Sequence, residues 1–66
     1  MIDYHEYIGD RVRVTDKDGD TFEGVIVSYE VGIVEDKDSD SIGIHQEKQN
    51  MAIEIPVLDI VSIEII

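Results

Sequence analysis

Residues 53–66, which read IEIPVLDIVSIEII, decide the fold class of this chain. Nine of these fourteen residues are Ile, Val or Leu, and they alternate with other residues in two runs on either side of residues 56–59. Alternation with a period of two among β-branched residues is typical of half-buried β-strands. The residues that we expect to share a strand face are Ile53, Ile55 and Val57 in the first run and Val61, Ile63 and Ile65 in the second.

The second run is apolar on its opposite face as well, where Ile60 and Ile66 accompany Ser62 and Glu64. A domain this small buries only about 60% of its unfolded surface, so it has little core with which to cover both faces of a strand. We therefore predict that copies of the chain cover this strand for each other in a homo-oligomer. The residues that we assign to the interface are Ile53, Ile55, Ile60, Val61, Ile63 and Ile66.

The length and composition indicate one domain that spans residues 1–66. The chain has no cysteine, which excludes disulfides and thiolate metal sites and fits a reducing compartment. Its first residues, MIDYHE, have neither the basic region nor the apolar run of a secretory signal. No stretch approaches the eighteen or so consecutive apolar residues that a membrane span requires. We expect a soluble, cytoplasmic protein without membrane contact.

A short helix is predicted at the amino end. Asp3 followed by Glu6 has the spacing of a capping box, and Gly9 is placed to end the helix. Tyr4 and Tyr7 fall at helical spacing, and we expect them to hold this helix against the rest of the fold.

The rest of the chain alternates between short apolar runs and polar turns. The Asp18-Gly19 step is a strong hairpin signal, and Gly24 predicts a sharp bend or bulge inside the longest strand. The strands that we predict cover residues 11–15, 21–31, 42–44, 51–55 and 60–66. The sequence therefore predicts an all-β protein with one short N-terminal helix and five strands in a strongly bent, antiparallel small barrel.

Two stretches resemble the Sm-like proteins, the family of the Lsm and bacterial host-factor proteins. YIGDRVRV at residues 7–14, followed by DGxxFxG at residues 18–24, is similar to the first half of that family's signature, and DIVSIE at residues 59–64 to its final strand. The resemblance implies a small barrel in which the fourth strand of one subunit pairs with the fifth of its neighbour and closes a ring. SH3-like modules are the alternative among small barrels.

The chain departs from the RNA-binding members of that family at two places. Those members carry an Asp and an Asn after the bent second strand, whereas residues 29–35 read YEVGIVE. They also carry an Arg or Lys followed by Gly before the last strand, whereas residues 56–59 read PVLD. We therefore transfer no uridine-binding residue to this chain.

The formal net charge is −11, and the five cations are Arg11, Arg13, Lys17, Lys37 and Lys48. Nucleic-acid affinity comes largely from Lys and Arg that displace phosphate counterions, so this charge disfavours RNA and anionic membranes. A local cationic patch on an oligomer is the arrangement that would still permit RNA binding. We expect Arg11 and Arg13 to pair instead with cross-strand carboxylates such as Glu23.

Four acidic residues, Asp36, Asp38, Asp40 and Glu47, have nearly the spacing of a calcium loop. Ser41 occupies the position where that loop needs Gly for a sharp turn, and the flanking residues have the pattern of strands rather than helices. We interpret the segment as a solvated acidic loop and predict no metal site or cofactor, while cation binding by these four residues stays open.

The sequence gives little indication of an active site. His5 and His45 lie forty residues apart, and no serine lies in a nucleophile-elbow context. Phe22 is expected to fill the core. We predict a non-catalytic, oligomerising Sm-like module that serves as an assembly or protein-interaction adaptor. The alternative is an RNA-binding Sm-like protein that uses a local cationic patch on the oligomer.

Overall fold

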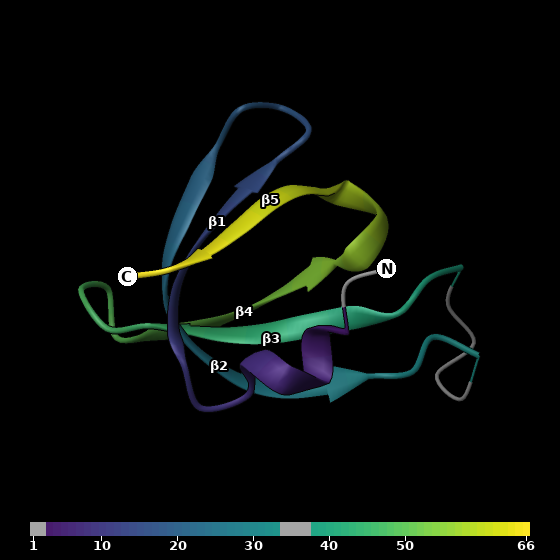
Figure 1. The fold of residues 1–66 in the computed structure, drawn as a ribbon, viewed down its shortest axis with the longest axis horizontal. Helices are drawn as coiled ribbons and strands as arrows, with labels where there is room; N and C mark the ends of the chain where they lie inside the picture. Colours follow the sequence, from purple (N-terminus) through teal and green to yellow (C-terminus); the bar gives the residue numbers. More distant parts are fainter. Residues whose placement is uncertain (1–2, 34–37) are drawn as a thin grey trace.

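A computed structural model describes residues 3–33 and 38–66. Five antiparallel strands confirm the predicted all-β class, whereas the predicted N-terminal helix is a single 3-10 turn (Figure 1). The elements in chain order are η1 (Tyr4–Tyr7), β1 (Arg11–Asp16), β2 (Thr21–Glu30), β3 (Ser41–Gln46), β4 (Met51–Pro56), η2 (Val57–Asp59) and β5 (Ile60–Ile65).

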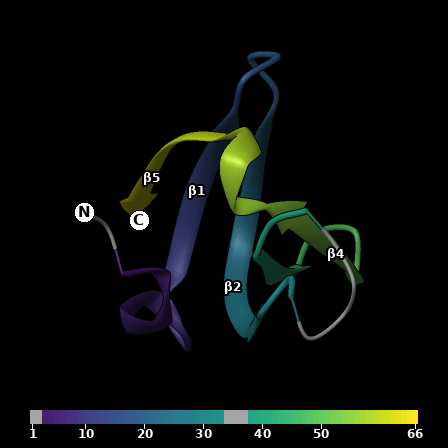
Figure 2. The ribbon, with the colours of Figure 1, turned by 90° about the vertical axis from the view of Figure 1, so that its right-hand side faces the viewer.

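The strands form one bent sheet in the order β4-β3-β2-β1-β5. Figure 2 shows β1 and β2 side by side at the centre, with β5 beyond β1 and β4 on the far side of β2. The sheet is not closed, because the chain of paired strands ends at β4 on one side and at β5 on the other. The structure thus has the predicted strands and bend, arranged as an open sheet.

The N-terminal turn begins with Asp3 as its N-cap, although the Asp3 side chain bonds to His5 rather than to Glu6 as a capping box would require. The Asp3 carboxylate accepts a hydrogen bond of 3.0 Å from the His5 N–H. The Glu6 N–H donates to the Asp3 carbonyl at 3.1 Å, which is the i to i+3 bonding of a 3-10 turn. Gly9 ends the turn with φ +93°, and its N–H donates to the Ile26 carbonyl of β2. A positive φ of this kind favours glycine, which has no Cβ.

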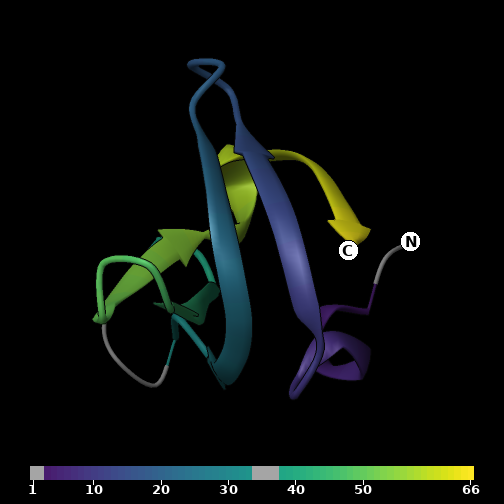
Figure 3. The same ribbon diagram turned by 90° about the vertical axis from the view of Figure 1, so that its left-hand side faces the viewer.

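The hairpin of β1 and β2 turns at Gly19, which has φ +85°. The Asp16 carboxylate accepts from the N–H groups of Asp18 and Asp20 at 3.0 and 2.9 Å, and so fixes the turn. Figure 3 shows this hairpin projecting beyond the rest of the sheet. Gly24 lies opposite Val12 in an unbroken register, so the predicted bulge is not at this residue.

The break in the register of β2 is at its pairing with β3, between Ile26 and Ser28, and leaves Val27 as the extra residue. Gly24 is required for another reason. A Cβ at this position would collide with the backbone carbonyl of His45 in β3. Glycine therefore lets β2 approach the backbone of β3 at His45.

The core is purely aliphatic. Each of its six residues is at most 5% exposed: Val12, Val14, Ile26, Ile42, Ile44 and Ile55. The half-buried residues that pack against it include all four aromatic side chains, as predicted for Tyr4, Tyr7 and Phe22. Burial of one such aliphatic side chain contributes about 1.5–3 kcal/mol, so this small cluster stabilises the fold substantially.

The last strand contains a bulge that shifts its alternation. Thr15 of β1 pairs with Ser62, whereas the next residue, Asp16, pairs with Ile60, so Val61 has no opposite residue in β1. The prediction that Val61 shares a strand face with Ile63 and Ile65 is therefore wrong, because an extra residue moves the side chains that follow it to the other face. Ile60 packs against the core instead, and the Val61 side chain is 68% exposed.

Candidate assembly surface at the open sheet edges

The two ends of the sheet, β4 and β5, are the candidate functional surface. Each has a neighbouring strand on one side only within the part of the chain that the structure describes. An edge strand presents backbone N–H and C=O groups that a further strand can pair with. Figure 2 shows the two edge strands joined by η2 and extending from this turn toward opposite sides.

The backbone N–H and C=O groups of two isoleucines in β5 point toward the open side of the strand. The Ile66 N–H donates to the Arg11 carbonyl of β1 at 3.0 Å. Hydrogen-bonding directions alternate along an antiparallel strand. The backbone N–H and C=O groups of Glu64 therefore also point toward β1, whereas those of Ile63 and Ile65 point away from the sheet. A strand that arrives at this edge would meet both residues.

Apolar side chains accompany this edge on both faces. The exposed fractions are 76% for Leu58 in η2, 68% for Val61, 65% for Ile65 and 47% for Ile66. The chain leaves these side chains largely uncovered, in agreement with the two-sided apolar pattern of residues 60–66. Large exposed apolar patches on small proteins are typical of interaction surfaces.

The six predicted interface residues divide into three groups. Ile55 is 5% exposed and belongs to the core of its own chain. Three others, Ile53, Ile60 and Ile63, are half-buried and pack against that core. Only Val61 and Ile66 are largely exposed, so these two are the members of the predicted set whose side chains are available to a neighbour.

Leu58 and Ile65 are exposed apolar residues that sequence reasoning missed. The pattern places Leu58 in the hinge between two runs, and Ile65 on the same strand face as Ile63. Ile65 does lie opposite the buried Val12, but it is at the open edge, where no further strand of the described chain covers it. The exposure of Leu58 could have been predicted from its position, because it is a hydrophobic residue in a hinge that also contains Pro and Asp.

The other edge, β4, is partly blocked by Pro56. The Val57 N–H donates to the Asp40 carbonyl at 2.8 Å. The backbone groups of Val57 therefore point toward β3, and those of Pro56, one residue before, point away from the sheet. Proline has no N–H, and edge strands are where it is tolerated. A strand that pairs with β4 therefore finds no donor at the Pro56 end.

Three cations are held in ion pairs. Arg13 donates to Glu23 at 2.7 Å and to Glu64 at 2.9 Å, which confirms the predicted pairing with Glu23. Arg11 instead donates twice to Glu47, at 2.9 and 3.0 Å, and Lys17 lies 3.0 Å from Asp59.

These ion pairs shift the titration of the groups involved. The hydrogen bond from Arg13 lowers the pKa of Glu23, and the bonds that Arg13 donates to Glu23 and Glu64 raise its own pKa. Lys17 is affected in the same way, since its hydrogen bond to Asp59 raises its pKa. The charge of these cations is therefore directed to carboxylates of the same chain.

The described carboxylates of the predicted acidic loop have separate partners or face solvent. Asp36 lies outside the described residues, and Asp38 is exposed. Asp40 accepts from the Tyr29 hydroxyl at 2.5 Å and from the Gly32 N–H at 2.8 Å, while Glu47 binds Arg11. Within residues 3–33 and 38–66, no three metal-ligating side chains cluster.

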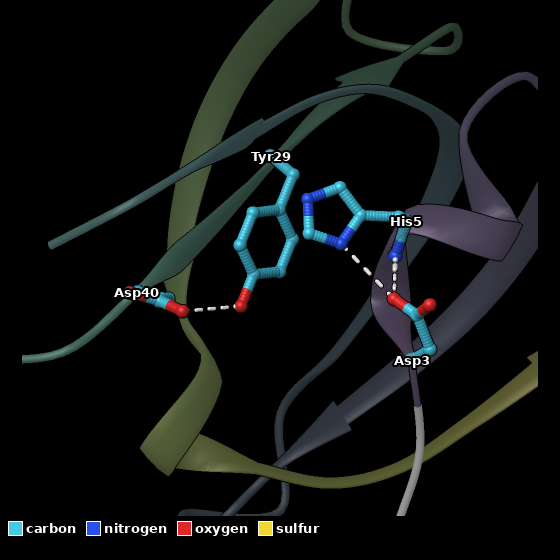
Figure 4. A network of polar contacts seen from close by, with 4 residues as sticks. All are labelled: Asp3, His5, Tyr29 and Asp40. Carbon is cyan, nitrogen blue, oxygen red and sulfur yellow. Dashed lines mark hydrogen bonds and ion pairs between the residues drawn. The ribbon is translucent and has the colours of Figure 1, made fainter.

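A polar network joins the N-terminal turn to β2 (Figure 4). The His5 ring stacks on the Tyr29 ring with centroids 3.9 Å apart, and its Nδ1 lies 3.0 Å from the Asp3 carboxylate. The Tyr29 hydroxyl donates to Asp40, and this bond raises the pKa of Tyr29 to about 12 and lowers that of Asp40.

This network is not visible in the sequence, because His5 and Tyr29 meet only after the turn folds back on the sheet. His45 belongs to a separate contact, with its Nε2 3.3 Å from the Asn50 side-chain oxygen. The two histidines that the sequence offers are thus held in different places. The network around Tyr29 links the N-terminal turn to the far end of β2.

Comparisons of this chain with protein-family models, with curated proteins and with solved structures return no match. The resemblance to Sm-like proteins therefore rests on the residues quoted from the sequence. Among the residues that the structure describes, no helix has the length and apolar character needed to cross a membrane.

Proposed function

We propose that this chain is a non-catalytic module of the Sm-like kind that assembles with copies of itself and serves as an adaptor for other proteins. The observation that carries the proposal is the open edge at β5. There, exposed apolar side chains lie on both faces of a strand whose outer backbone groups point away from the sheet.

Pairing of β5 with β4 of the next copy accounts for both edges at once. Such a contact uses different surfaces on the two partners, so it repeats from copy to copy and closes into a ring when the rotation permits. Closure covers both open edges. Because Pro56 offers no N–H, we expect β5 to pair with the part of β4 that precedes it.

The energetics favour an interface that combines side chains with backbone pairing. The exposed apolar side chains at this edge are Leu58, Val61, Ile65 and Ile66. Complete burial of one Val, Leu or Ile side chain is worth about 1.5–3 kcal/mol, so burial of these four supplies several kcal/mol. Association costs roughly 4–15 kcal/mol in lost freedom. The outward N–H and C=O groups of β5 must therefore pair as well for the assembly to be stable.

The mass of the particle in solution tests the proposal. Sedimentation equilibrium at micromolar concentration should give a defined multiple of the 7.5 kDa chain. The variant Ile65→Pro removes an N–H that faces outward and should dissociate the assembly, while Ile65→Val should keep it. Circular dichroism confirms that each variant is folded. A 7.5 kDa species throughout this range would overturn the proposal.

The RNA-binding alternative has less support. Arg11, Arg13 and Lys17 each bind a carboxylate, and an RNA phosphate would have to displace that partner. Fluorescence anisotropy with uridine-rich and adenine-rich oligonucleotides at low salt separates the two hypotheses. We expect no binding. Binding that falls steeply as salt rises would favour RNA as the partner.

A further inference from the structure

Met51 is the exposed large apolar side chain of the β4 edge. It begins the strand opposite Gln46 of β3, and it is 54% exposed. Side chains alternate between the two faces of a strand, so Met51 shares a face with Ile53 and Ile55. Ile53 packs against the core, and Ile55 is buried in it. Met51 is therefore the member of this row that the chain leaves largely uncovered.

The open edge of β5 has a matching side chain. Ile65 lies opposite Val12 of β1, which is fully buried, so Ile65 is on the core face of the sheet. Its side chain is nevertheless 65% exposed, at an edge that no further strand of the described chain covers. Each open edge thus presents one exposed apolar side chain on its core face, Met51 on β4 and Ile65 on β5.

Pairing of β5 with β4 of the next copy brings these two side chains together, so the inference that follows rests on the proposed function. The opposite face of β4 carries Ala52 and Glu54. Apolar side chains on adjacent strands stabilise a sheet when they lie beside each other. We therefore expect the core faces of the two copies to join, with Ile65 of one copy against Met51 and Ile53 of the next.

The sulfur of Met51 makes this contact sensitive to oxidation. The chain has no cysteine and two methionines, Met1 and Met51, of which Met1 lies outside the described residues. Oxidation converts the apolar thioether of methionine to a polar, chiral sulfoxide, which disrupts methionine-containing interfaces. Among the residues that the structure describes, Met51 thus carries the one side-chain sulfur, and it lies at the edge where we expect copies to meet.

We propose that Met51 is an oxidation site that controls assembly. The thioether sulfur donates an electron pair to one oxygen of hydrogen peroxide, and the O–O bond breaks as the S–O bond forms. The departing hydroxide takes the proton of the transferred oxygen, so that the peroxide is reduced to water and the sulfide is oxidised to sulfoxide. The polar S–O group then lies against Ile65 of the next copy without a hydrogen-bond donor, which disfavours the contact.

Oxidation takes place in the free chain, because assembly covers the sulfur. A copy that carries the sulfoxide rejoins the assembly poorly, so the assembled fraction falls as subunits exchange. Methionine sulfoxide reductases return the sulfoxide to the thioether. The change is therefore reversible, and it acts on the same edge that the proposed function uses.

Sedimentation of the full chain before and after treatment with hydrogen peroxide tests this proposal. Mass spectrometry of proteolytic peptides verifies that Met51 has gained one oxygen. We expect the oxidised chain to associate about tenfold more weakly or worse, and reduction by methionine sulfoxide reductases to restore the original mass. An assembly that persists with Met51 fully oxidised would overturn this proposal and leave the proposed function standing. A monomer before treatment would overturn both.

Two substitutions at this position serve as controls. Met51→Leu keeps the apolar volume and removes the sulfur, while Met1 stays in place. This variant should assemble and should not respond to peroxide. Met51→Gln introduces a polar group on a side chain of similar length, and should weaken association about tenfold without peroxide. Circular dichroism verifies that both variants are folded. Dissociation of Met51→Leu by peroxide would assign the effect to another group and would contradict the proposal.

The rate of oxidation gives an independent test. The Ile65→Pro variant should stay dissociated and so leave Met51 exposed. At a protein concentration where sedimentation shows the wild type assembled, Met51 should be oxidised several-fold more slowly in the wild type than in Ile65→Pro. Equal rates would mean that Met51 lies outside the contact between copies, and would overturn the proposal.

Discussion

At the scale of single residues, Tyr29 makes two contacts that the sequence pattern does not predict. Its ring supports His5 of the N-terminal turn, and its hydroxyl donates to Asp40 just before β3. Asp40 also accepts from the Gly32 N–H, so the same carboxylate orders the backbone that follows β2. One side chain therefore connects three segments that are distant in the sequence.

The first prediction concerns the stability of the fold in alkali. The hydrogen bond to Asp40 raises the pKa of Tyr29 to about 12, above its ordinary value of 10.0. A group whose pKa is raised by folding adds stability below its unfolded pKa and loses it as pH rises through the folded pKa. The free energy of unfolding should therefore fall between about pH 10 and 12.

Urea denaturation at several pH values in this window measures the effect. Tyr29→Phe keeps the ring and removes the hydroxyl, so its stability should depend less on alkaline pH than that of the wild type. Tyr7→Phe is the control, because Tyr7 packs against the same core. The same pH dependence in Tyr29→Phe and the wild type would contradict the role given to the Tyr29–Asp40 bond.

Glycine positions give the second prediction at this scale. In Gly24→Ala the new Cβ meets the His45 carbonyl, a backbone group that cannot rotate away. Such overpacking should cost about 1–3 kcal/mol of folding free energy or more. Gly19→Ala meets no atom within 4 Å but is strained by its φ of +85°. A left-handed conformation costs a residue with a Cβ roughly 1–2 kcal/mol.

Chemical denaturation of the two glycine variants compares these costs. A smaller loss for Gly24→Ala than for Gly19→Ala would contradict the close approach of β2 and β3.

At the scale of elements, the strands are predictable because alternation is a local property. Thr21–Glu30 and Met51–Pro56 match the predicted runs closely. The bulge in β5 is not predictable, since it depends on contacts with β1. The Lys17 N–H donates to the Asp59 carbonyl at 2.8 Å, and Asp16 lies opposite Ile60, so the hairpin of β1 sets where β5 begins.

The shifted alternation of β5 gives the third prediction. Ile60 packs against the core, whereas Val61 is exposed. Ile60→Asp should destabilise the fold by about 2–4 kcal/mol, because it places a charge against apolar side chains. Val61→Asp changes a surface position and should alter the folding free energy by about 0.5 kcal/mol or less. Val61→Asp should instead weaken assembly.

Denaturation and sedimentation on the same samples distinguish these effects. Ile63→Asp serves as a second core variant, since Ile63 lies opposite the buried Val14. A large loss of folding free energy from Val61→Asp, with Ile60→Asp tolerated, would mean that the strand alternates without the bulge.

At the scale of the whole molecule, the sequence predicts which surface is apolar but not which side chains it exposes. The pattern of residues 60–66 correctly indicates apolar side chains on both faces. Assignment of Ile55 to an interface overlooks that the inner face of β4 fills the core of its own chain. Apart from the Arg13–Glu23 pair, the sequence also does not predict which carboxylates the cations bind. Arg11 meets Glu47 only because the bend of the sheet brings the turn after β3 beside β1.

The fourth prediction follows from the net charge of −11 on every copy. An assembly of such chains concentrates negative charge, and its self-repulsion opposes the apolar contacts at the edges. Salt screens this repulsion, with a Debye length that falls from about 30 Å at 0.01 M to about 10 Å at 0.1 M. The proposed oligomer should therefore become tighter as salt rises, in contrast to a complex held by ion pairs or by phosphate contacts. Sedimentation at a fixed protein concentration across this range of salt measures the change. Dissociation on addition of salt would show that attraction between charges holds the copies together, and would exclude an interface built on Val61, Ile65 and Ile66.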